Sequence, residues 1–234
     1  MESVYGDRNH EHRDARKKLL ETYIKESVSK GGVLVVPAFS LERTQELLFE
    51  LNDMVEHKHI PRIPIYVDSP LAIKATEVYR HSDAYFNKET QHIISSGDDV
   101  FNFPGLHFTE TREESMAIWE KHGPKIIKSG SGMANGGRIV HHLKRYLSEH
   151  NTTVMLVGYQ ALGTPGRHIA DGAKEVRLNG ETVAINARVL QLHGYSGHKD
   201  SDGLLDFAAT ATKAIKIFCV MGEPKSSMFL AQRI

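Results

Sequence analysis

The 234-residue sequence predicts an α/β fold, in which a parallel sheet flanked by helices is followed by a smaller part of another architecture. Short apolar segments alternate with amphipathic helical segments up to about residue 163, which is typical of a doubly wound sheet. One predicted strand, Val33–Val36, is apolar throughout, as expected where helices cover both faces of a sheet. Beyond a boundary at residues 163–168 we expect antiparallel structure, because Asn179-Gly180-Glu181 between two short apolar segments indicates an antiparallel hairpin.

Each predicted element has a local signal. Apolar residues at four-residue intervals predict a helix over about 9–30, which Gly31-Gly32 ends. Ser40 is expected to cap the next helix, and Thr111 with Glu114 forms a capping box for a later one. Residues 87–104 carry weak signals and are expected to be irregular. The other predicted strands are 65–67, 106–109, 125–128, 154–157 and 187–192, and the other predicted helices are 71–86 and 139–147.

The composition is that of an ordinary globular protein, with 40% hydrophobic and 25% charged residues. Lysine plus arginine equals aspartate plus glutamate, 29 against 29, which argues against a large DNA-coating surface but not against a local basic groove. The lone cysteine, Cys219, excludes an internal disulfide framework and favours a reducing compartment, here the cytoplasm. The sequence shows no signal peptide and no stretch that would cross a membrane, and both ends are expected to be cut from a longer parent.

The segment Gly194–Asp200 lies where a predicted strand meets a predicted helix. Asp200 or Ser201 is suited to cap that helix, and the small residues of the segment allow a close approach of the backbone. Such a junction is a usual position for a reacting group in an α/β protein, so His198 is a candidate functional residue. On local grounds alone, a histidine with a purely structural role is the competing interpretation.

Several ordered motifs resemble the β-CASP branch of the metallo-β-lactamase-fold nucleases, which includes RNase J and the endonuclease of mRNA 3′-end processing. Any one of the motifs is a weak signal, but their order along nearly the whole chain is specific. The motifs are Glu2–Arg8, Val36–Arg43, Tyr66–Pro70, Ser129–Met133, Gly158–Gln160, Gly163–Arg167, Gly194–Asp200 and Val220–Glu223.

The resemblance implies a Rossmann-like β-CASP domain inserted into a metallo-β-lactamase αββα sandwich, to which the chain later returns. It divides the chain into residues 1–7 at the end of the N-terminal sandwich part, a β-CASP domain at 8–163 and a returning part at 164–234. It also implies a ribonuclease that hydrolyses RNA phosphodiester bonds, with single-stranded RNA as partner and a homodimer as an allowed assembly. One alternative is a non-catalytic RNA-binding or scaffolding paralogue, and a more distant one is a Rossmann-like enzyme that binds a nucleotide.

In the resembled family, the acid and the histidine that match Glu2 and His198 meet beside the metal centre. Phosphodiester hydrolysis requires a proton for the leaving oxygen, and a histidine that titrates near neutrality can supply it. A carboxylate on the other ring nitrogen fixes the tautomer. We therefore expect His198 to be the proton donor or transition-state stabiliser and Glu2 to orient it. The alternative is a surface glutamate and a packing histidine.

The glycine-rich turn Lys128–Arg138 connects a predicted strand to a predicted helix, and free backbone amides at a helix N-terminus form an anion site. The turn lacks the lysine and hydroxyl residue of an ATP-binding loop, which disfavours ATP. The resemblance implies that the turn contacts RNA phosphate, and the alternative is a tight turn that needs glycine for its geometry alone. The resemblance also allows Arg167 to contact phosphate, and the alternative is a solvated side chain. The expected RNA contacts are Ser129, Ser131, Gly132, Gly136, Gly137, Arg138 and Arg167.

The resemblance implies two zinc ions in the intact enzyme, with most ligands upstream of the Glu2 motif. The remaining ligand position, a histidine in the family, is Met221 here, and a thioether is a poor ligand for zinc. The segment His10–Ala15 imitates the zinc signature of the fold but ends in alanine, and it is expected to be a solvated helix start. We therefore expect no metal site and no cofactor in this chain, which should be inactive alone.

Further polar groups have a structural interpretation. Asp68-Ser69-Pro70 ends a predicted strand, and capping of the next helix by Asp68 or Ser69 is favoured over ligand binding. The pairs His57/His59 and His141/His142 lack the spacing that closes a metal cage.

Overall fold

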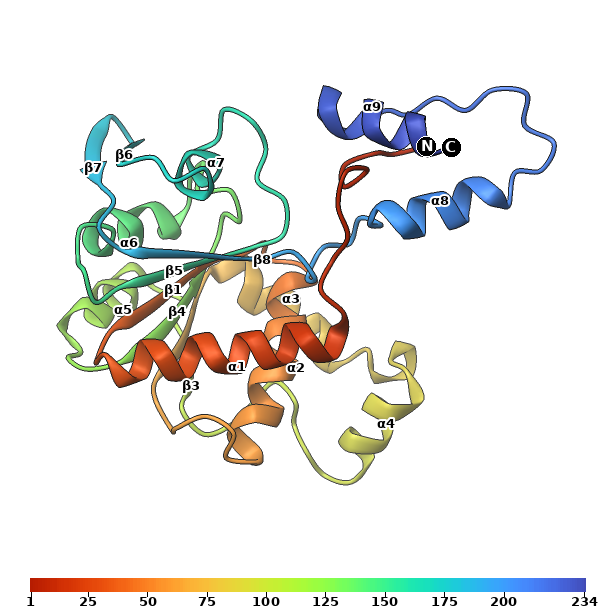
Figure 1. The fold of residues 1–234 in the computed structure, drawn as a ribbon. Helices are drawn as coiled ribbons and strands as arrows, with labels where there is room; N and C mark the ends of the chain where they lie inside the picture. The colour runs from red at the N-terminus through yellow and green to blue at the C-terminus, as the bar shows by residue number, and fades with distance from the viewer.

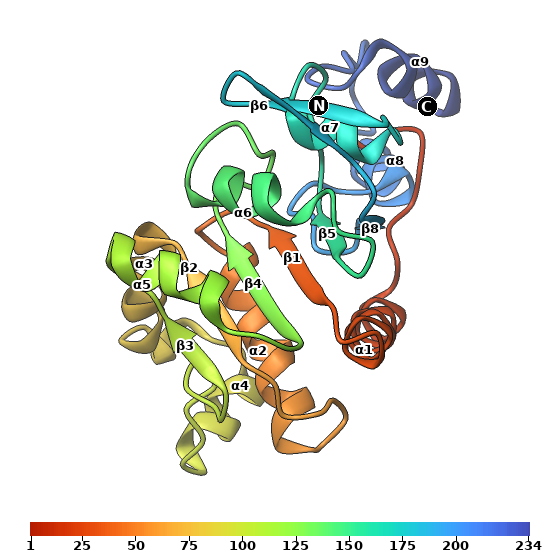
Figure 2. The ribbon, with the colours of Figure 1, turned by 90° about the vertical axis from the view of Figure 1, so that its left-hand side faces the viewer.

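A computed structural model describes all residues, 1–234, and contains one large sheet and one small one. The large sheet has six strands in the order β3-β2-β4-β1-β5-β8, and every neighbouring pair is parallel. The strands are β1 (Val33–Pro37), β2 (Ile65–Asp68), β3 (Leu106–Phe108), β4 (Lys125–Ser129), β5 (Thr153–Val157), β6 (Glu175–Leu178), β7 (Glu181–Ala184) and β8 (Arg188–Leu192). The α/β fold class with a parallel sheet is confirmed (Figures 1 and 2).

Helices connect the strands and pack against both faces of the sheet. The α-helices are α1 (Arg13–Ser29), α2 (Arg43–Glu56), α3 (Pro70–Arg80), α4 (Lys88–Ser95), α5 (Arg112–Ala117), α6 (Arg138–Tyr146), α7 (Pro165–Ala170), α8 (Ser201–Ala209) and α9 (Pro224–Arg233). Two short 3₁₀ turns are η1 (Asp83–Tyr85) and η2 (Ile118–Glu120). None of these helices combines the length and the apolar character needed to cross a bilayer.

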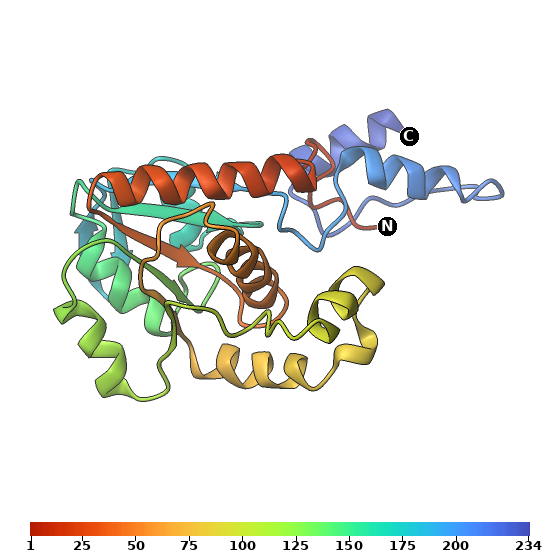
Figure 3. The same ribbon diagram turned by 90° about the horizontal axis from the view of Figure 1, so that it is seen from below.

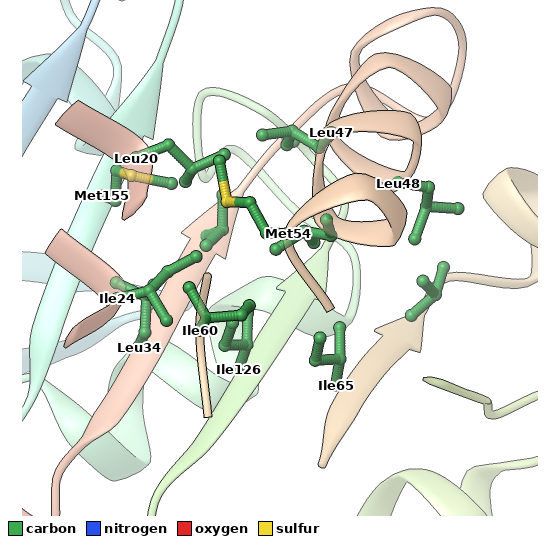
Figure 4. Packing of buried hydrophobic residues seen from close by; sticks show 14 of the residues in the cluster. Leu20, Ile24, Leu34, Leu47, Leu48, Met54, Ile60, Ile65, Ile126 and Met155 are labelled. Atoms are coloured by element: carbon green, nitrogen blue, oxygen red, sulfur yellow. The ribbon is translucent and has the colours of Figure 1, made fainter. Parts of the chain in front are cut away.

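Two apolar cores lie on opposite faces of the large sheet. On one face, α1 and α2 pack against Leu34 of β1, Ile65 of β2 and Ile126 of β4 (Figure 4). On the other face, α6 packs against Val35 and Ile127, which follow Leu34 and Ile126 in the chain. Successive residues of a strand face opposite sides, so a strand covered on both faces must be apolar throughout. This explains the continuous apolar run that predicts β1.

The change of architecture after residue 163 is confirmed only in part. Strands β6 and β7 form the predicted antiparallel hairpin, with Asn179 and Gly180 both at positive φ in its turn. Strand β8, however, returns to the large sheet and pairs in parallel with β5. The expectation of antiparallel structure throughout the later part is therefore wrong for β8, and the division at 7 and 163 stays a prediction.

Three local predictions need comment. The capping box of Thr111 and Glu114 is confirmed at the start of α5. Residues 87–104 are not wholly irregular, because Asn87 caps the short helix α4 by accepting a hydrogen bond from the Thr90 amide. Ser40 does not cap α2, which begins at Arg43; its hydroxyl lies 3.1 Å from the hydroxyl of Ser69.

The first residues of the chain lie beside its last elements. Isolated bridges join Glu2 to Val220 and Tyr5 to Asp200, and α8 and α9 lie with both chain ends at one side of the sheet (Figures 1 and 3). The resemblance implies that this part belongs to an αββα sandwich. That assignment stays a prediction, because the strand pairing here is limited to the two bridges.

Candidate functional site

The segment after β8 carries His198 to the surface between the sheet and α8. Asp200 caps α8 by accepting a hydrogen bond from the Gly203 amide at 2.9 Å. Of the two predicted caps, Asp200 and Ser201, the structure therefore selects Asp200. The His198 amide donates to the hydroxyl of Ser196 at 3.1 Å, which closes the turn before the cap. The His198 side chain is 43% exposed, so its ring is open to a ligand.

Glu2 and His198 meet although 196 positions separate them in the sequence. Oxygen Oε2 of Glu2 lies 3.1 Å from Nδ1 of His198, and Oε1 accepts a hydrogen bond from the Lys199 amide at 3.2 Å. A carboxylate only accepts hydrogen bonds, so Nδ1 carries a proton and Nε2 is the ring nitrogen left for another group. The geometry expected for an orienting acid and its histidine is present.

The segment His10–Ala15, which imitates a zinc signature, contacts the loop that carries His198. Helix α1 begins only at Arg13, and His10 and Glu11 precede it. Nε2 of His10 lies 3.0 Å from the His198 carbonyl oxygen, and Glu11 accepts hydrogen bonds from the amides of His193 and Gly194. The expectation of a solvated helix start is therefore wrong for these two residues. The contacts join segments far apart in the sequence, so no local pattern could indicate them.

The glycine-rich turn lies between β4 and α6. The Ser131 hydroxyl donates to the Gly136 carbonyl, while the hydroxyl of buried Ser129 donates to the Asp68 carbonyl. Gly137 has φ of +75°, and a side chain there would meet the Gly130 carbonyl oxygen at 2.5 Å, so only glycine fits. The amides of Gly132, Met133, Gly136 and Gly137 donate to no protein group. The turn thus offers amides to an anion, but not the Ser129 hydroxyl.

Arg138 has internal partners. Its Nη1 donates to Asp68 Oδ1 at 2.7 Å and to the Thr109 carbonyl at 2.9 Å, and its Nη2 donates to the Glu110 carbonyl at 2.7 Å. These bonds use three of the five guanidinium N–H donors, which leaves Nε–H and one Nη2–H without a protein partner. The contact of Arg138 with an RNA phosphate stays a prediction. In the structure its guanidinium neutralises the charge of Asp68.

Asp68 is the centre of a buried network that the sequence does not indicate. Besides Arg138, its carboxylate accepts hydrogen bonds from Thr109 Oγ1 at 2.7 Å, Ser115 Oγ at 2.6 Å and His142 Nε2 at 2.6 Å. Burial raises the pKa of Asp68, but these hydrogen bonds outweigh burial and hold it at about 2. Ser69, and not Asp68, caps α3. The partners come from different elements, so only the fold assembles them.

Arg167 lies near the glycine-rich turn but is also paired. Its Nε donates to Asp171 at 2.9 Å and its Nη1 to Glu223 at 2.5 Å. The turn and α7 are joined by a hydrogen bond from the Gly166 amide to the Met133 carbonyl at 3.0 Å. The structure therefore brings together Glu2 with His198, and the turn with α7, but no hydrogen bond links these two groups. The RNA contact of Arg167 stays a prediction.

The residues present do not fit a zinc ion. No group of three or more histidine, cysteine, aspartate or glutamate residues is arranged to hold a metal. Met221 is 76% exposed with φ of 66°, and its thioether is a poor zinc ligand. The Nδ1 atom of His198 is within hydrogen-bond distance of Glu2. A zinc site therefore cannot be completed from this chain alone.

Comparison with known proteins places these features in a family. Residues 44–169, which are more than half of the chain, match the family described as the Beta-Casp domain. The chain belongs to the β-CASP family. Residues 182–234 match a second family, described as the Zn-dependent metallo-hydrolase RNA specificity domain. The resemblance drawn from the ordered motifs is thereby confirmed.

Curated relatives of this β-CASP chain extend over its whole length. A ribonuclease of Thermus thermophilus is 40% identical over 99% of the chain and 52% of that protein. The transcription termination factor FttA of Methanosarcina mazei is 29% identical over 100% of the chain and 38% of that protein. An RNase J-like protein of Methanocaldococcus jannaschii is 29% identical over 100% of the chain and 54% of that protein. The chain spans about half the length, or less, of these relatives.

Proposed function

We propose that this chain is the β-CASP portion of a metal-dependent ribonuclease that hydrolyses RNA phosphodiester bonds. The contact of Glu2 with His198 carries the proposal, because it places a carboxylate on one ring nitrogen of a histidine, as proton transfer by that histidine requires. The family and the name of the Thermus relative support the reaction class. The chain by itself would be inactive, because its residues cannot complete a zinc site.

In this proposal His198 delivers a proton from Nε2 to the leaving oxygen of the RNA. Glu2 holds the proton on Nδ1, so that the protonated ring has Nε2–H left to donate to the RNA. Glu2 also stabilises the positive charge of that ring. Its second oxygen, bonded to the Lys199 amide, keeps the carboxylate from rotating away.

The glycine-rich turn would hold a backbone phosphate of the same RNA. Its amides at Gly132, Gly136 and Gly137 donate to no protein group. Gly136 and Gly137 directly precede α6, and Gly137 is the N-cap of that helix. Ser131 shapes the turn, while Arg138 and Arg167 would add positive charge beside it. We propose single-stranded RNA as the ligand, a cytoplasmic location in keeping with the lone Cys219, and a homodimer as the assembly.

The test uses the protein encoded by the complete reading frame that contains this chain, loaded with zinc. We expect His198→Ala and Glu2→Gln to lower kcat for RNA cleavage by about 10²–10⁴-fold with little change in RNA affinity. His168→Ala, which removes an exposed imidazole of α7 without a hydrogen bond, is the matched control. Cleavage by His198→Ala at the wild-type rate would remove the proposed role.

The same experiment addresses the non-catalytic alternative, which Met221 motivates. RNA binding without cleavage by the wild-type protein, together with cleavage by Met221→His, would identify a paralogue that lost its zinc ligand. Binding without cleavage by both proteins would support a scaffolding role and contradict the nuclease proposal.

A further inference from the structure

A buried cluster of charged side chains lies beneath the segment that carries His198. Arg16 of α1 and Glu50 of α2 are 6% and 3% exposed and form an ion pair. Tyr195, which is fully buried, donates its hydroxyl to the second oxygen of Glu50. The Arg16 guanidinium also lies over the Tyr195 ring, 4.1 Å from its centroid. Tyr195 is thus held at its ring and at its hydroxyl.

The cluster also holds the backbone next to Tyr195. Arg16 Nη1 donates to the Gly194 carbonyl at 2.7 Å, and Glu11 accepts from the Gly194 amide at 2.6 Å. A side chain at position 194 would meet the Glu11 carbonyl oxygen at 2.8 Å, so the approach of the two segments requires glycine. Both peptide groups flanking Gly194 are therefore fixed by residues near the start of α1.

Charge in the cluster is balanced by a shared carboxylate. Glu46 accepts from Arg16 at 2.7 Å with one oxygen and from Arg43 at 2.8 Å with the other. A buried ion pair of this kind contributes little stability compared with apolar residues of the same volume, but it restricts its partners to one geometry. The cluster therefore has more value for positioning than for stability.

The fixed segment ends at the candidate proton donor. Beyond Tyr195, the Ser196 hydroxyl accepts from the His198 amide, and the His198 ring meets Glu2. We propose that Arg16, Glu50 and Tyr195 are positioning residues that set where the His198 ring stands relative to Glu2 and the RNA. The proposal rests on the proposed function for its catalytic consequence, whereas the positioning itself is a property of this chain.

Tyr195→Phe tests the proposal, because it removes the hydrogen bond to Glu50 and leaves the ring under Arg16. In the zinc-loaded protein of the complete reading frame, we expect kcat for RNA cleavage to fall by about 10- to 100-fold, while KM stays within about twofold. In the 234-residue chain, we expect the ¹⁵N signals of the His198 ring to shift, because its contact with Glu2 changes. Glu50→Gln, at the other end of the same hydrogen bond, should act in the same direction.

Tyr66→Phe is the matched control, because the Tyr66 hydroxyl makes no protein hydrogen bond and Tyr66 lies on β2. Unchanged kcat and unchanged His198 signals in folded Tyr195→Phe would overturn the proposal. If the wild-type protein does not cleave RNA, the proposed function fails. The ¹⁵N signals of the His198 ring then decide by themselves whether Tyr195 positions that ring. A shift in Tyr195→Phe but not in Tyr66→Phe upholds the positioning role, and no shift overturns it.

Discussion

Two buried charged side chains on neighbouring strands, Asp68 of β2 and Lys128 of β4, have opposite surroundings. The strands pair in parallel with Val67 opposite Lys128 and Asp68 opposite Ser129. Because side chains alternate along a strand, Asp68 faces α6 while Lys128 faces α1 and α2. Asp68 accepts four side-chain hydrogen bonds, whereas Lys128 Nζ has no partner in a small cavity lined mainly by apolar side chains.

The comparison shows that hydrogen-bond partners, and not burial alone, decide whether a buried side chain is charged near neutral pH. Burial raises the pKa of Asp68, yet its hydrogen bonds bring that pKa to about 2. Burial lowers the pKa of Lys128 to about 7, and the attraction of Asp68 offsets only part of the effect. Asp68 therefore stays charged near neutral pH, while Lys128 loses its proton there.

The largest effect is expected from Asp68→Asn. The change removes the charge and replaces one of the two carboxylate oxygens, each of which accepts two of the four hydrogen bonds, so two of the four donors lose their acceptor. We expect the free energy of unfolding at pH 7 to fall by about 3–5 kcal/mol, as for other broken buried pairs. Urea unfolding followed by circular dichroism measures the loss. Glu181→Gln, which breaks the exposed pair with Lys144, should change stability by less than about 1 kcal/mol.

The pH dependence gives a second measure of the same variant. The folded-state pKa of Asp68, about 2, lies below its ordinary value of 3.8. The stability that the charged form contributes is thus fully present above the ordinary pKa and is lost as pH falls through about 2. Asp68→Asn should remove this part of the acid dependence. An unchanged acid profile, with unfolding free energy near the wild-type value, would contradict the importance of the network.

The two sides of the comparison also show what the sequence can predict. The parallel sheet and the β6–β7 hairpin follow from local signals, since an apolar run and an Asn-Gly turn are readable within a few residues. The shell of Asp68 has no such signal, because its partners come from separate elements. For the same reason the prediction that Ser40 caps α2 is wrong, because its hydroxyl contacts the hydroxyl of Ser69, which lies 29 positions away in the sequence.

The candidate site follows the same division. The pairing of Glu2 with His198 could be expected only through the family resemblance, because 196 positions separate the two residues. The contacts of Glu11 with the amides of residues 193 and 194 were missed, because a histidine-rich segment before a helix normally lies in solvent. Local pattern predicts elements, while the contacts that join distant segments require the fold.

A smaller effect, of opposite sign, is expected from Lys128→Met. The folded-state pKa of Lys128, about 7, lies below its ordinary value of 10.5, so between these pH values the unfolded chain binds a proton that the folded chain does not. Wild-type stability should therefore rise as pH increases from 7 toward 10. Replacing the ammonium group with an apolar side chain should stabilise the protein at pH 7 by about 1–4 kcal/mol and remove this rise.

Urea unfolding at several pH values between 6.5 and 10 measures both consequences of Lys128→Met. Lys18→Met is the matched control, because Lys18 is exposed on α1 and forms no ion pair. It should leave stability within about 0.5 kcal/mol of the wild type at every pH. Destabilisation by Lys128→Met would mean that the amine has a partner, such as a buried water or a bound anion.

The smallest effect is the coupling between the two charges. Asp68 raises the pKa of Lys128 through their attraction across the sheet, so each charge loses some stabilisation when the other is removed. In a double-mutant cycle, Asp68→Asn should cost about 1 kcal/mol less in the Lys128→Met background than in the wild type. With Lys18→Met in place of Lys128→Met, the changes should add within about 0.5 kcal/mol. If Asp68→Asn lowers the free energy of unfolding equally in the wild type and in Lys128→Met, the two charges are not coupled. Lys128 would then be tolerated without attraction from the Asp68 carboxylate.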